Sequence, residues 1–302
     1  MMQFIDELTG IAGADCILQN ESMKKHTTFR VGGPADYYVT VDTREKLRDV
    51  ILLCRRERVS FYILGNGSNL LVSDKGIRGV VINTSTKLNR VTVEGTRITA
   101  EAGCNLAKVA REALNAELTG MEFAAGIPGT LGGAVVMNAG AYGSDISHII
   151  TEATVLTIDG EFIRLSKDAL ELGYRTSCIE RNKYIVIEAV FELKKGKRAE
   201  IASYMEELAA RRREKQPLEY PSAGSTFKRP EGYFAGKLIE DSGLSGFRVG
   251  GASVSTKHCG FVINDKEGTA GDILELCNKI SEVVRDRFGV GLEMEIKKIG
   301  DF

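Results

Sequence analysis

The pattern of hydrophobic and polar residues predicts a mixture of strands and helices. Alternating or continuous apolar runs predict strands at residues 37–41, 61–64, 70–72, 184–193 and 292–299. Two further alternating segments predict hairpins at residues 91–100 and 154–165, with turns at Glu94-Gly95 and Asp159-Gly160. Helices are expected from Asp42, Asn105, about residue 199 and Thr269, and the first of them has an apolar stripe of Leu47, Val50, Ile51 and Cys54.

Local signals sharpen the ends of two of these helices. Asp42 is followed three residues later by Glu45, which predicts a capping box at the start of the first helix. Thr269 and Asp272 have the same spacing, and Gly289 is expected to end the last helix. Because strands and helices do not alternate regularly, the order predicts an α+β fold rather than a doubly wound parallel sheet.

Chain length and one polar segment suggest the domain organisation. The chain has 302 residues, enough for two or three domains. Residues 194–198 are polar and include Gly196, so we expect a boundary near them. The predicted division is residues 1–85, 86–197 and 198–302.

Glycine is concentrated in residues 126–143, which hold six glycines in eighteen positions. Glycine inside a helix or strand costs about 0.5–1 kcal/mol relative to alanine. We therefore expect that these residues lie inside neither a helix nor a strand. Where a glycine-rich backbone comes very close to a ligand, its N–H groups can instead surround an anion such as a diphosphate. Residues 65–69 have the same character. The candidate contacts are Gly65, Asn66, Gly67, Ser68, Asn69, Gly126, Ile127, Pro128, Gly129, Gly132, Gly133, Asn138, Ala139 and Gly140.

These glycine loops do not match the common nucleotide motifs. No G-x-G-x-x-G opens a helix with an acidic residue about 20 positions later, and no G-x-x-x-x-G-K-[ST] occurs. One interpretation is a phosphate-bearing dinucleotide held between two small α+β lobes by backbone amides. The alternative is a pair of tight turns in a glycine-rich β protein.

Composition narrows the possible partners. The net charge is −1, so no general basic field points to nucleic acid. The six cysteines form no C-x-x-C pair and there are only three histidines, so we expect neither a metal site nor disulfides. The N-terminus lacks a signal-peptide pattern, and no apolar run approaches the roughly 20 residues of a membrane helix. We expect a cytoplasmic protein without a membrane partner, as a monomer or weak homo-oligomer.

Eight segments, in order along nearly the whole chain, resemble the UDP-N-acetylenolpyruvoylglucosamine reductases. Each is weak alone, but the ordered set is specific. They are residues 28–35, 65–72, 126–143, 173–175, 221–228, 250–252, 260–264 and 292–295.

The resemblance implies the fold and the cofactor. We expect the vanillyl-alcohol-oxidase-like flavin fold, with FAD-binding lobes at 1–85 and 86–197 and an α+β substrate-binding domain at 198–302. The chain resembles the shorter of the two types in this family, which lacks an inserted tyrosine-bearing loop. FAD is expected to be non-covalent, since neither glycine loop contains histidine or cysteine, with NADPH as reductant. Arg30 is a further expected FAD contact.

The resemblance also implies catalytic residues. Hydride passes from NADPH to FAD and then to the outer carbon of the enolpyruvyl double bond, and the inner carbon takes a proton. By resemblance Ser225 is the proton donor, Arg175 pairs with the enolpyruvyl carboxylate, and Glu295 acts as an acid or hydrogen-bond partner. From the residues alone, Ser225 could equally be an ordinary turn serine, and Glu295 a solvated residue.

Four residues are expected on the substrate. Lys215 matches a substrate-binding lysine, although the basic run around it could be a solvated helix face. Lys228 and Tyr174 lie beside the catalytic positions, and His258 falls in a substrate-contact region or packs in the core.

The sequence departs from the family pattern at three places. Ser245 stands where a lysine is expected, Arg229 where some members have asparagine, and Cys259 where alanine is usual. The first two bear on how the substrate is held. Cys259 is either a reactive thiol or, like most of the cysteines, a small buried hydrophobe.

Two other functions fit the same residues. A flavin oxidase of this fold would act on a sugar or alcohol. A non-catalytic nucleotide-binding module would hold no flavin.

Overall fold

The computed structural model describes residues 2–302. Contacts within the chain define two units. Unit 1 comprises the residues up to Gln19 together with 37–66 and 79–211, and unit 2 comprises residues 20–36, 67–78 and 212–302. Strands β1, β2 and β5 and helix α6 each have residues in both units. The sequence-based division at residues 85 and 197 stays a prediction.

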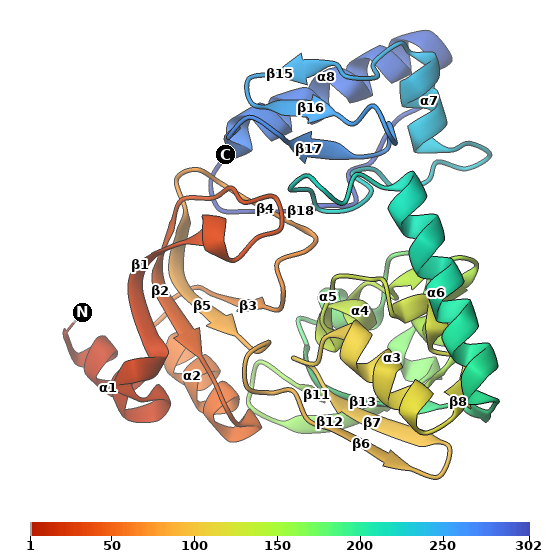
Figure 1. Ribbon diagram of the computed structural model, residues 1–302. Helices are drawn as coiled ribbons and strands as arrows, with labels where there is room; N and C mark the ends of the chain where they lie inside the picture. Colours follow the sequence, from red (N-terminus) through yellow and green to blue (C-terminus); the bar gives the residue numbers. More distant parts are fainter. Residues whose placement is uncertain (1) are drawn as a thin grey trace. The chain divides into compact units, whose positions relative to one another are not determined.

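One sheet has four strands in the order β1-β2-β5-β3. Helices α1 and α2 pack with it in unit 1, where Leu8, Val39, Leu47, Ile51 and Ile82 are fully buried (Figure 1). The predicted apolar stripe of α2 is therefore confirmed. The bounds are α1 Met2–Ala12, β1 Ile17–Ser22, β2 Pro34–Thr40, α2 Arg44–Arg56, β3 Phe61–Leu64 and β5 Ile77–Asn83.

The start of α2 differs from the prediction by one residue. Thr43, and not Asp42, is the N-cap, and its hydroxyl accepts a hydrogen bond from the N–H of Lys46 at 3.1 Å. The Asp42 carboxylate instead pairs with the Lys46 ammonium at 3.0 Å. Both residue types favour the N-cap position, so the long-range placement of the chain decides between them.

The second sheet of unit 1 is antiparallel, with five strands in the order β12-β11-β13-β7-β6. Both predicted hairpins are confirmed, although Glu94 pairs with Arg97 and the first turn therefore falls on Gly95 and Thr96. Helices α3 and α4 pack against this sheet (Figure 1). The strands are β6 Val91–Glu94, β7 Arg97–Glu101, β11 Ile150–Leu156, β12 Phe162–Ser166 and β13 Ile185–Glu192.

Shorter elements complete unit 1. The helices are α3 Leu106–Asn115, α4 Leu131–Val136, α5 Cys178–Arg181 and α6 Arg198–Lys215, the last running on into unit 2. The two-residue strands are β8 Leu118–Thr119, β9 Gly140–Ala141, β10 Ser144–Asp145 and β14 Lys194–Lys195. Helix α6, expected from about residue 199, carries the basic run and ends at Lys215.

The expectation that glycines 126–143 avoid regular structure is wrong at α4, which contains Gly132 and Gly133. A Cβ atom on Gly132 would lie 3.0 Å from the Cβ of Ala102, so glycine lets the helix start against the end of β7. The N–H of Gly132 donates to the carbonyl of Ala102 at 2.8 Å. Close packing therefore outweighs the low helix propensity of glycine.

Unit 2 is built around α8, which packs on a three-stranded antiparallel sheet in the order β15-β16-β17 and beside α7 (Figure 1). The capping box of Thr269 and Asp272 is confirmed, as is Gly289 at the end of α8 with φ 67°. The elements are β15 Arg248–Val249, β16 Ala252–Val254, β17 Val262–Asn264, α7 Ala235–Asp241 and α8 Ala270–Phe288.

The last strand is shorter than predicted. Strand β18 spans Lys297–Ile299 and pairs in parallel with β4, Leu70–Val72. Residues 293–295 instead contact residues 226–228 through an isolated bridge between Phe227 and Met294 and neighbouring hydrogen bonds. Across residues 2–302 no helix has the length and apolarity to cross a membrane, and no cluster of potential metal ligands occurs.

Candidate active site

The loop that begins at Gly67 in unit 2 packs closely against residues 26–28. Gly67 has a φ of +61°, and a Cβ atom there would lie 2.0 Å from the carbonyl oxygen of His26. The N–H of Thr28 donates to the carbonyl of Gly67 at 3.2 Å. Only glycine permits this approach without moving the backbone.

The side chain of Thr28 tests whether this contact between Gly67 and residues 26–28 suits a cofactor. Its Oγ1 is the one buried side-chain oxygen or nitrogen atom among residues 2–302 without a hydrogen-bond partner. Leaving such an atom unsatisfied costs about 1–3 kcal/mol. A polar group of a bound cofactor would satisfy it, so the residues present fit the predicted ligand.

The segment that carries Thr28 is anchored from β17. The buried side chain of Asn264 donates to the carbonyl of Phe29 at 2.9 Å and accepts from the N–H of Gly268 at 2.6 Å. Next in the segment, Arg30 has a left-handed backbone with φ 57° and an exposed side chain. Asn264 lies in a motif that the sequence singled out, but its role depends on this distant contact.

Ser225 lies on an open turn. Gly224 before it has a φ of +76° with no atom near its missing Cβ, and Ser225 itself is exposed. Thr226 after it is 1% exposed and makes three hydrogen bonds. Its N–H donates to the carbonyl of Gly260, its hydroxyl accepts from the N–H of Val262, and its carbonyl accepts from the N–H of Glu295, each at 2.9 Å.

The structure brings three predicted site residues of unit 2 together. The N–H of Glu295 bonds to the residue after Ser225, and the Glu295 carbonyl accepts from the side chain of Asn69 at 3.1 Å. The carbonyl of Asn69 also accepts from the N–H of Lys297 at 2.9 Å. The loop with Asn69, the turn with Ser225 and the segment with Glu295 are therefore joined by one network of hydrogen bonds.

Lys228 and Glu293 pair with each other next to this network. The N–H of Lys228 donates to the carbonyl of Glu293 at 2.8 Å, and the two side chains form an ion pair at 2.6 Å. Since Lys228 is 27% and Glu293 72% exposed on the side chain, a stronger anion could displace this exposed partner.

His258 lies on the same unit and is half-buried. Burial lowers the pKa of its imidazole, and the positive charge of Lys215 lowers it further. Its Nδ1 accepts a hydrogen bond from the N–H of Gly260 at 3.1 Å, and its ring packs edge-on against Phe261 at 5.0 Å between centroids. The neutral ring is therefore favoured, with a packing role as well as access to the charge of Lys215.

In unit 1 the strand β3 is followed directly by Gly65 and Asn66, the first two residues of the first glycine loop. A Cβ atom on Gly65 would lie 2.2 Å from the hydroxyl oxygen of Thr130, which shows how closely two loops approach. The side chain of Asn66 donates to Asn105 at 2.6 Å and to the carbonyl of Pro128 at 3.2 Å. The Asn66 side chain thus joins the first glycine loop to the second.

Asn138 links the second glycine loop to the turn that carries Arg175. Its buried amide donates to the carbonyl of Gly173 at 3.0 Å and accepts from the N–H of Ser147 at 2.9 Å. The guanidinium of Arg175 donates to the carbonyl of Gly140 at 3.3 Å and lies 5.0 Å from the centre of the exposed Tyr174 ring. Arg175 has a left-handed backbone with φ 54°, which is strained for a residue other than glycine.

Models of two protein families match this chain. A model described as an FAD binding domain matches residues 35–166, and one described as the C-terminal domain of UDP-N-acetylenolpyruvoylglucosamine reductase matches residues 216–299. A protein named UDP-N-acetylenolpyruvoylglucosamine reductase from Clostridium novyi (strain NT) is 52% identical, over 100% of this chain and 99% of that one. The chain belongs to this reductase family.

Solved structures agree with this assignment. The crystal structure of the UDP-N-acetylenolpyruvylglucosamine reductase from Thermus caldophilus aligns with a TM-score of 0.80 and 36% identity, covering 93% of this chain and 98% of that one. The glucose dehydrogenase Phl p 4.0202 aligns with a TM-score of 0.52 over 65% of this chain and 44% of that one, at 14% identity, which shows a shared fold alone. The predicted α+β flavin fold is confirmed.

Membership of the reductase family fixes the general chemistry. The chain is an FAD-binding oxidoreductase, and the expected cofactor and reductant, FAD and NADPH, are those of this family. Gly65, Asn66 and the glycine segment from Gly126 lie in the part that matches the FAD binding domain. Ser225 and Glu295 lie in the part that matches the family's C-terminal domain.

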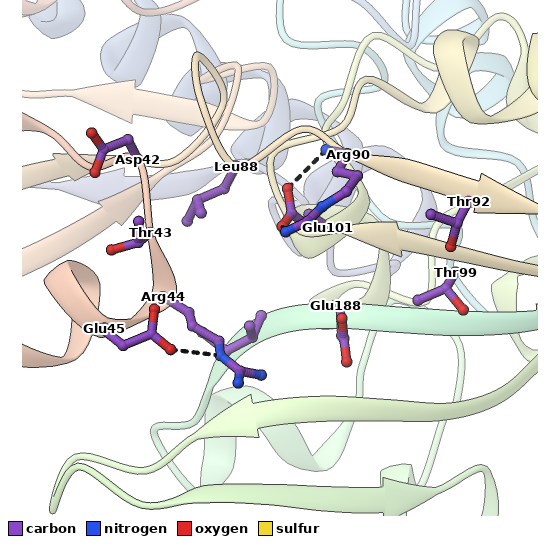
Figure 2. A pocket seen from close by; sticks show the side chains of 11 residues that line it. Asp42, Thr43, Arg44, Glu45, Leu88, Arg90, Thr92, Thr99, Glu101 and Glu188 are labelled. Carbon is purple, nitrogen blue, oxygen red and sulfur yellow. Dashed lines mark hydrogen bonds and ion pairs between the residues drawn. The ribbon is translucent and has the colours of Figure 1, made fainter.

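A polar pocket in unit 1 lies outside the predicted site. Its lining includes Arg44, Glu45, Arg90, Glu101 and Glu188. Arg44 bonds to Glu45 at 2.9 Å and Arg90 to Glu101 at 3.1 Å, and dashed lines mark these two pairs in Figure 2. None of the predicted site residues lines this pocket.

Four of the six cysteines are buried. Burial raises the pKa of the thiols of Cys54 and Cys277 to about 12 and that of Cys104 to about 11, and burial also raises the pKa of Cys178. These residues act as small buried hydrophobes, as predicted for most of the cysteines. Cys259 is half-buried.

Proposed function

We propose that this protein uses NADPH to reduce UDP-N-acetylglucosamine enolpyruvate to UDP-N-acetylmuramate through bound FAD. In this proposal it acts in the cytoplasm, at a step of peptidoglycan precursor synthesis. The observation that carries the proposal is the network in unit 2, where the exposed Ser225 precedes the residue whose carbonyl holds Glu295. The hydroxyl of Ser225 can serve as the proton donor that an enolate-like centre needs, and Glu295 supplies a carboxyl group that can act as an acid or hydrogen-bond partner.

FAD, when bound, supplies the hydride that adds to the outer carbon of the enolpyruvyl double bond. Ser225 donates its hydroxyl proton to the inner carbon, on which charge builds as the hydride arrives. The open turn leaves this hydroxyl accessible, and the buried Thr226 fixes the backbone beside it. A positioned donor of this kind contributes roughly 10²–10⁴-fold to rate.

The substrate carboxylate is assigned to Arg175 and Glu295. The planar guanidinium of Arg175 matches a carboxylate with two parallel hydrogen bonds. Its anchoring to Gly140 and its strained backbone hold that side chain in one orientation before substrate arrives. Glu295 acts as an acid or hydrogen-bond partner of the same carboxylate.

The sugar nucleotide is assigned to Lys215, Lys228, His258 and Tyr174. Lys215 meets the diphosphate as a point charge, and Lys228 exchanges its exposed partner Glu293 for the substrate. His258 stays largely neutral because of its lowered pKa and supports the residues beside it. Tyr174 offers an exposed ring next to Arg175.

The cofactor and the reductant can be tested together. We expect purified protein to be yellow, and acid precipitation to release all of the colour, because no histidine or cysteine lies in residues 65–69 or 126–143. Under anaerobic conditions NADPH should bleach the flavin faster than NADH does, and sugars or alcohols should not bleach it. Colour that stays with the pellet would contradict non-covalent binding, and bleaching by an alcohol would favour the oxidase alternative.

Replacing Arg175 with lysine tests the carboxylate assignment. Lysine keeps the charge but loses the planar fork, and hydrogen bonds to charged groups contribute about 1.5–3 kcal/mol. We therefore expect reduction by NADPH to persist while reoxidation by substrate slows roughly 10- to 10²-fold. Stopped-flow absorbance of each half-reaction makes the comparison. If neither half-reaction changes, Arg175 does not hold the enolpyruvyl carboxylate.

A further inference from the structure

The main chain of Glu295 is held on both sides by other site segments. Its N–H bonds to the carbonyl of Thr226, and its carbonyl accepts the side-chain amide of Asn69. Asn69 then accepts from the N–H of Lys297, where the parallel pairing of β4 and β18 begins with Leu70 opposite Lys297. The position of the Glu295 backbone is therefore set partly by a side chain of the glycine loop.

Asn69 is an expected FAD contact, as are the other residues of its loop. Its side-chain amide donates to the carbonyl of Glu295, 226 residues further along the chain. Asn66, three positions earlier, directs the same functional group to Asn105 and the carbonyl of Pro128. Two asparagines in one loop thus bind different partners.

We propose that Asn69 is a positioning residue for the reaction: its side chain holds Glu295 in place for the substrate and does not hold the cofactor. This inference rests on the proposed role of Glu295. The side-chain amide and the main-chain carbonyl of Asn69 bind the main chain on either side of Ile296, at Glu295 and at Lys297. The main chain that carries the Glu295 carboxylate is therefore fixed relative to the loop. Misplacing a reacting group by about 1 Å can cost on the order of 10²-fold in rate.

The substitution Asn69→Asp tests the proposal against a matched control, Asn66→Asp. In Asn69→Asp a carboxylate oxygen faces the carbonyl of Glu295 and repels it. We expect this variant to retain FAD, with reoxidation by substrate slowed roughly 10- to 10²-fold more than reduction by NADPH. Asn66→Asp, which breaks the link between the glycine loops, is expected to lose FAD. Asn69→Ala removes the donor without adding charge and is measured alongside.

Combination with Glu295→Gln gives a readout that a general loss of stability would not move. If Asn69 acts through Glu295, the double variant reoxidises no more slowly than the slower single variant, because the two effects are not additive. Multiplied effects, equal slowing of both half-reactions, or loss of FAD from Asn69→Asp would overturn the proposal.

The same measurements separate this inference from the proposed function. Slow reoxidation in Glu295→Gln beside native reoxidation in Asn69→Asp and Asn69→Ala would overturn the role of Asn69 alone. Native reoxidation in Glu295→Gln would overturn the role of Glu295, and the role of Asn69 with it.

Discussion

Replacing Ser225 with alanine is expected to lower turnover with the enolpyruvyl substrate by roughly 10²–10⁴-fold, the loss typical of a positioned proton donor. NADPH should still reduce the flavin at a near-native rate, because the hydroxyl gives up its proton only in the second half-reaction. The loss should appear mainly in kcat, since the hydroxyl matters more in the transition state than in the ground state. Stopped-flow absorbance of the two half-reactions measures both effects.

A conservative variant separates proton donation from local structure. Ser225→Cys should keep part of the activity, because a thiol can also donate a proton. Ser225 is exposed on its turn, so neither change should disturb the core. Failure of the NADPH half-reaction would mean that the substitution damaged the flavin site. Full activity of the alanine variant would contradict the assignment, and the proton would then come from water or Glu295.

Replacing Gly67 with alanine is expected to abolish FAD retention. The new Cβ would lie 2.0 Å from the carbonyl oxygen of His26, and the left-handed backbone adds a cost of roughly 1–2 kcal/mol for a residue with a side chain. The loop must therefore move away from residues 26–28, which breaks the hydrogen bond from Thr28 and opens the site around its buried hydroxyl. Flavin absorbance per mole of purified protein measures retention.

Gly95→Ala is the matched control for that substitution. Gly95 has a φ of +65°, close to that of Gly67, but no atom lies within 4 Å of its added Cβ. It should lose a similar backbone energy, seen as a lower melting temperature, while keeping FAD. If Gly67→Ala retains a full complement of flavin, the contact between Gly67 and residues 26–28 is not part of the cofactor site.

Elements governed by local pattern could be predicted from the sequence. The apolar stripe of α2 and the box of Thr269 and Asp272 lie within a few residues of chain, so their signals are complete in the sequence. The prediction that Asp42 is the N-cap was wrong, because the neighbouring Thr43 also suits that position and occupies it.

The site was predictable only in part, because its geometry depends on contacts between distant segments. The glycine run and the order of the motifs predict loops 65–69 and 126–143 as the cofactor site. They could not show that Gly132, in the first turn of α4, packs against Ala102, or that Asn69 bonds to Glu295. The unpartnered hydroxyl of Thr28 is likewise visible only when the chain is folded around it.

The central claim is that the reduced flavin passes its electrons to an enolpyruvyl sugar nucleotide. The most direct test is to reduce the protein with one equivalent of NADPH without oxygen and then add UDP-N-acetylglucosamine enolpyruvate. The account predicts that the visible flavin absorbance returns fully, with UDP-N-acetylmuramate formed in equal amount. Absorbance that returns only when oxygen is admitted, with the sugar nucleotide unchanged, would contradict it.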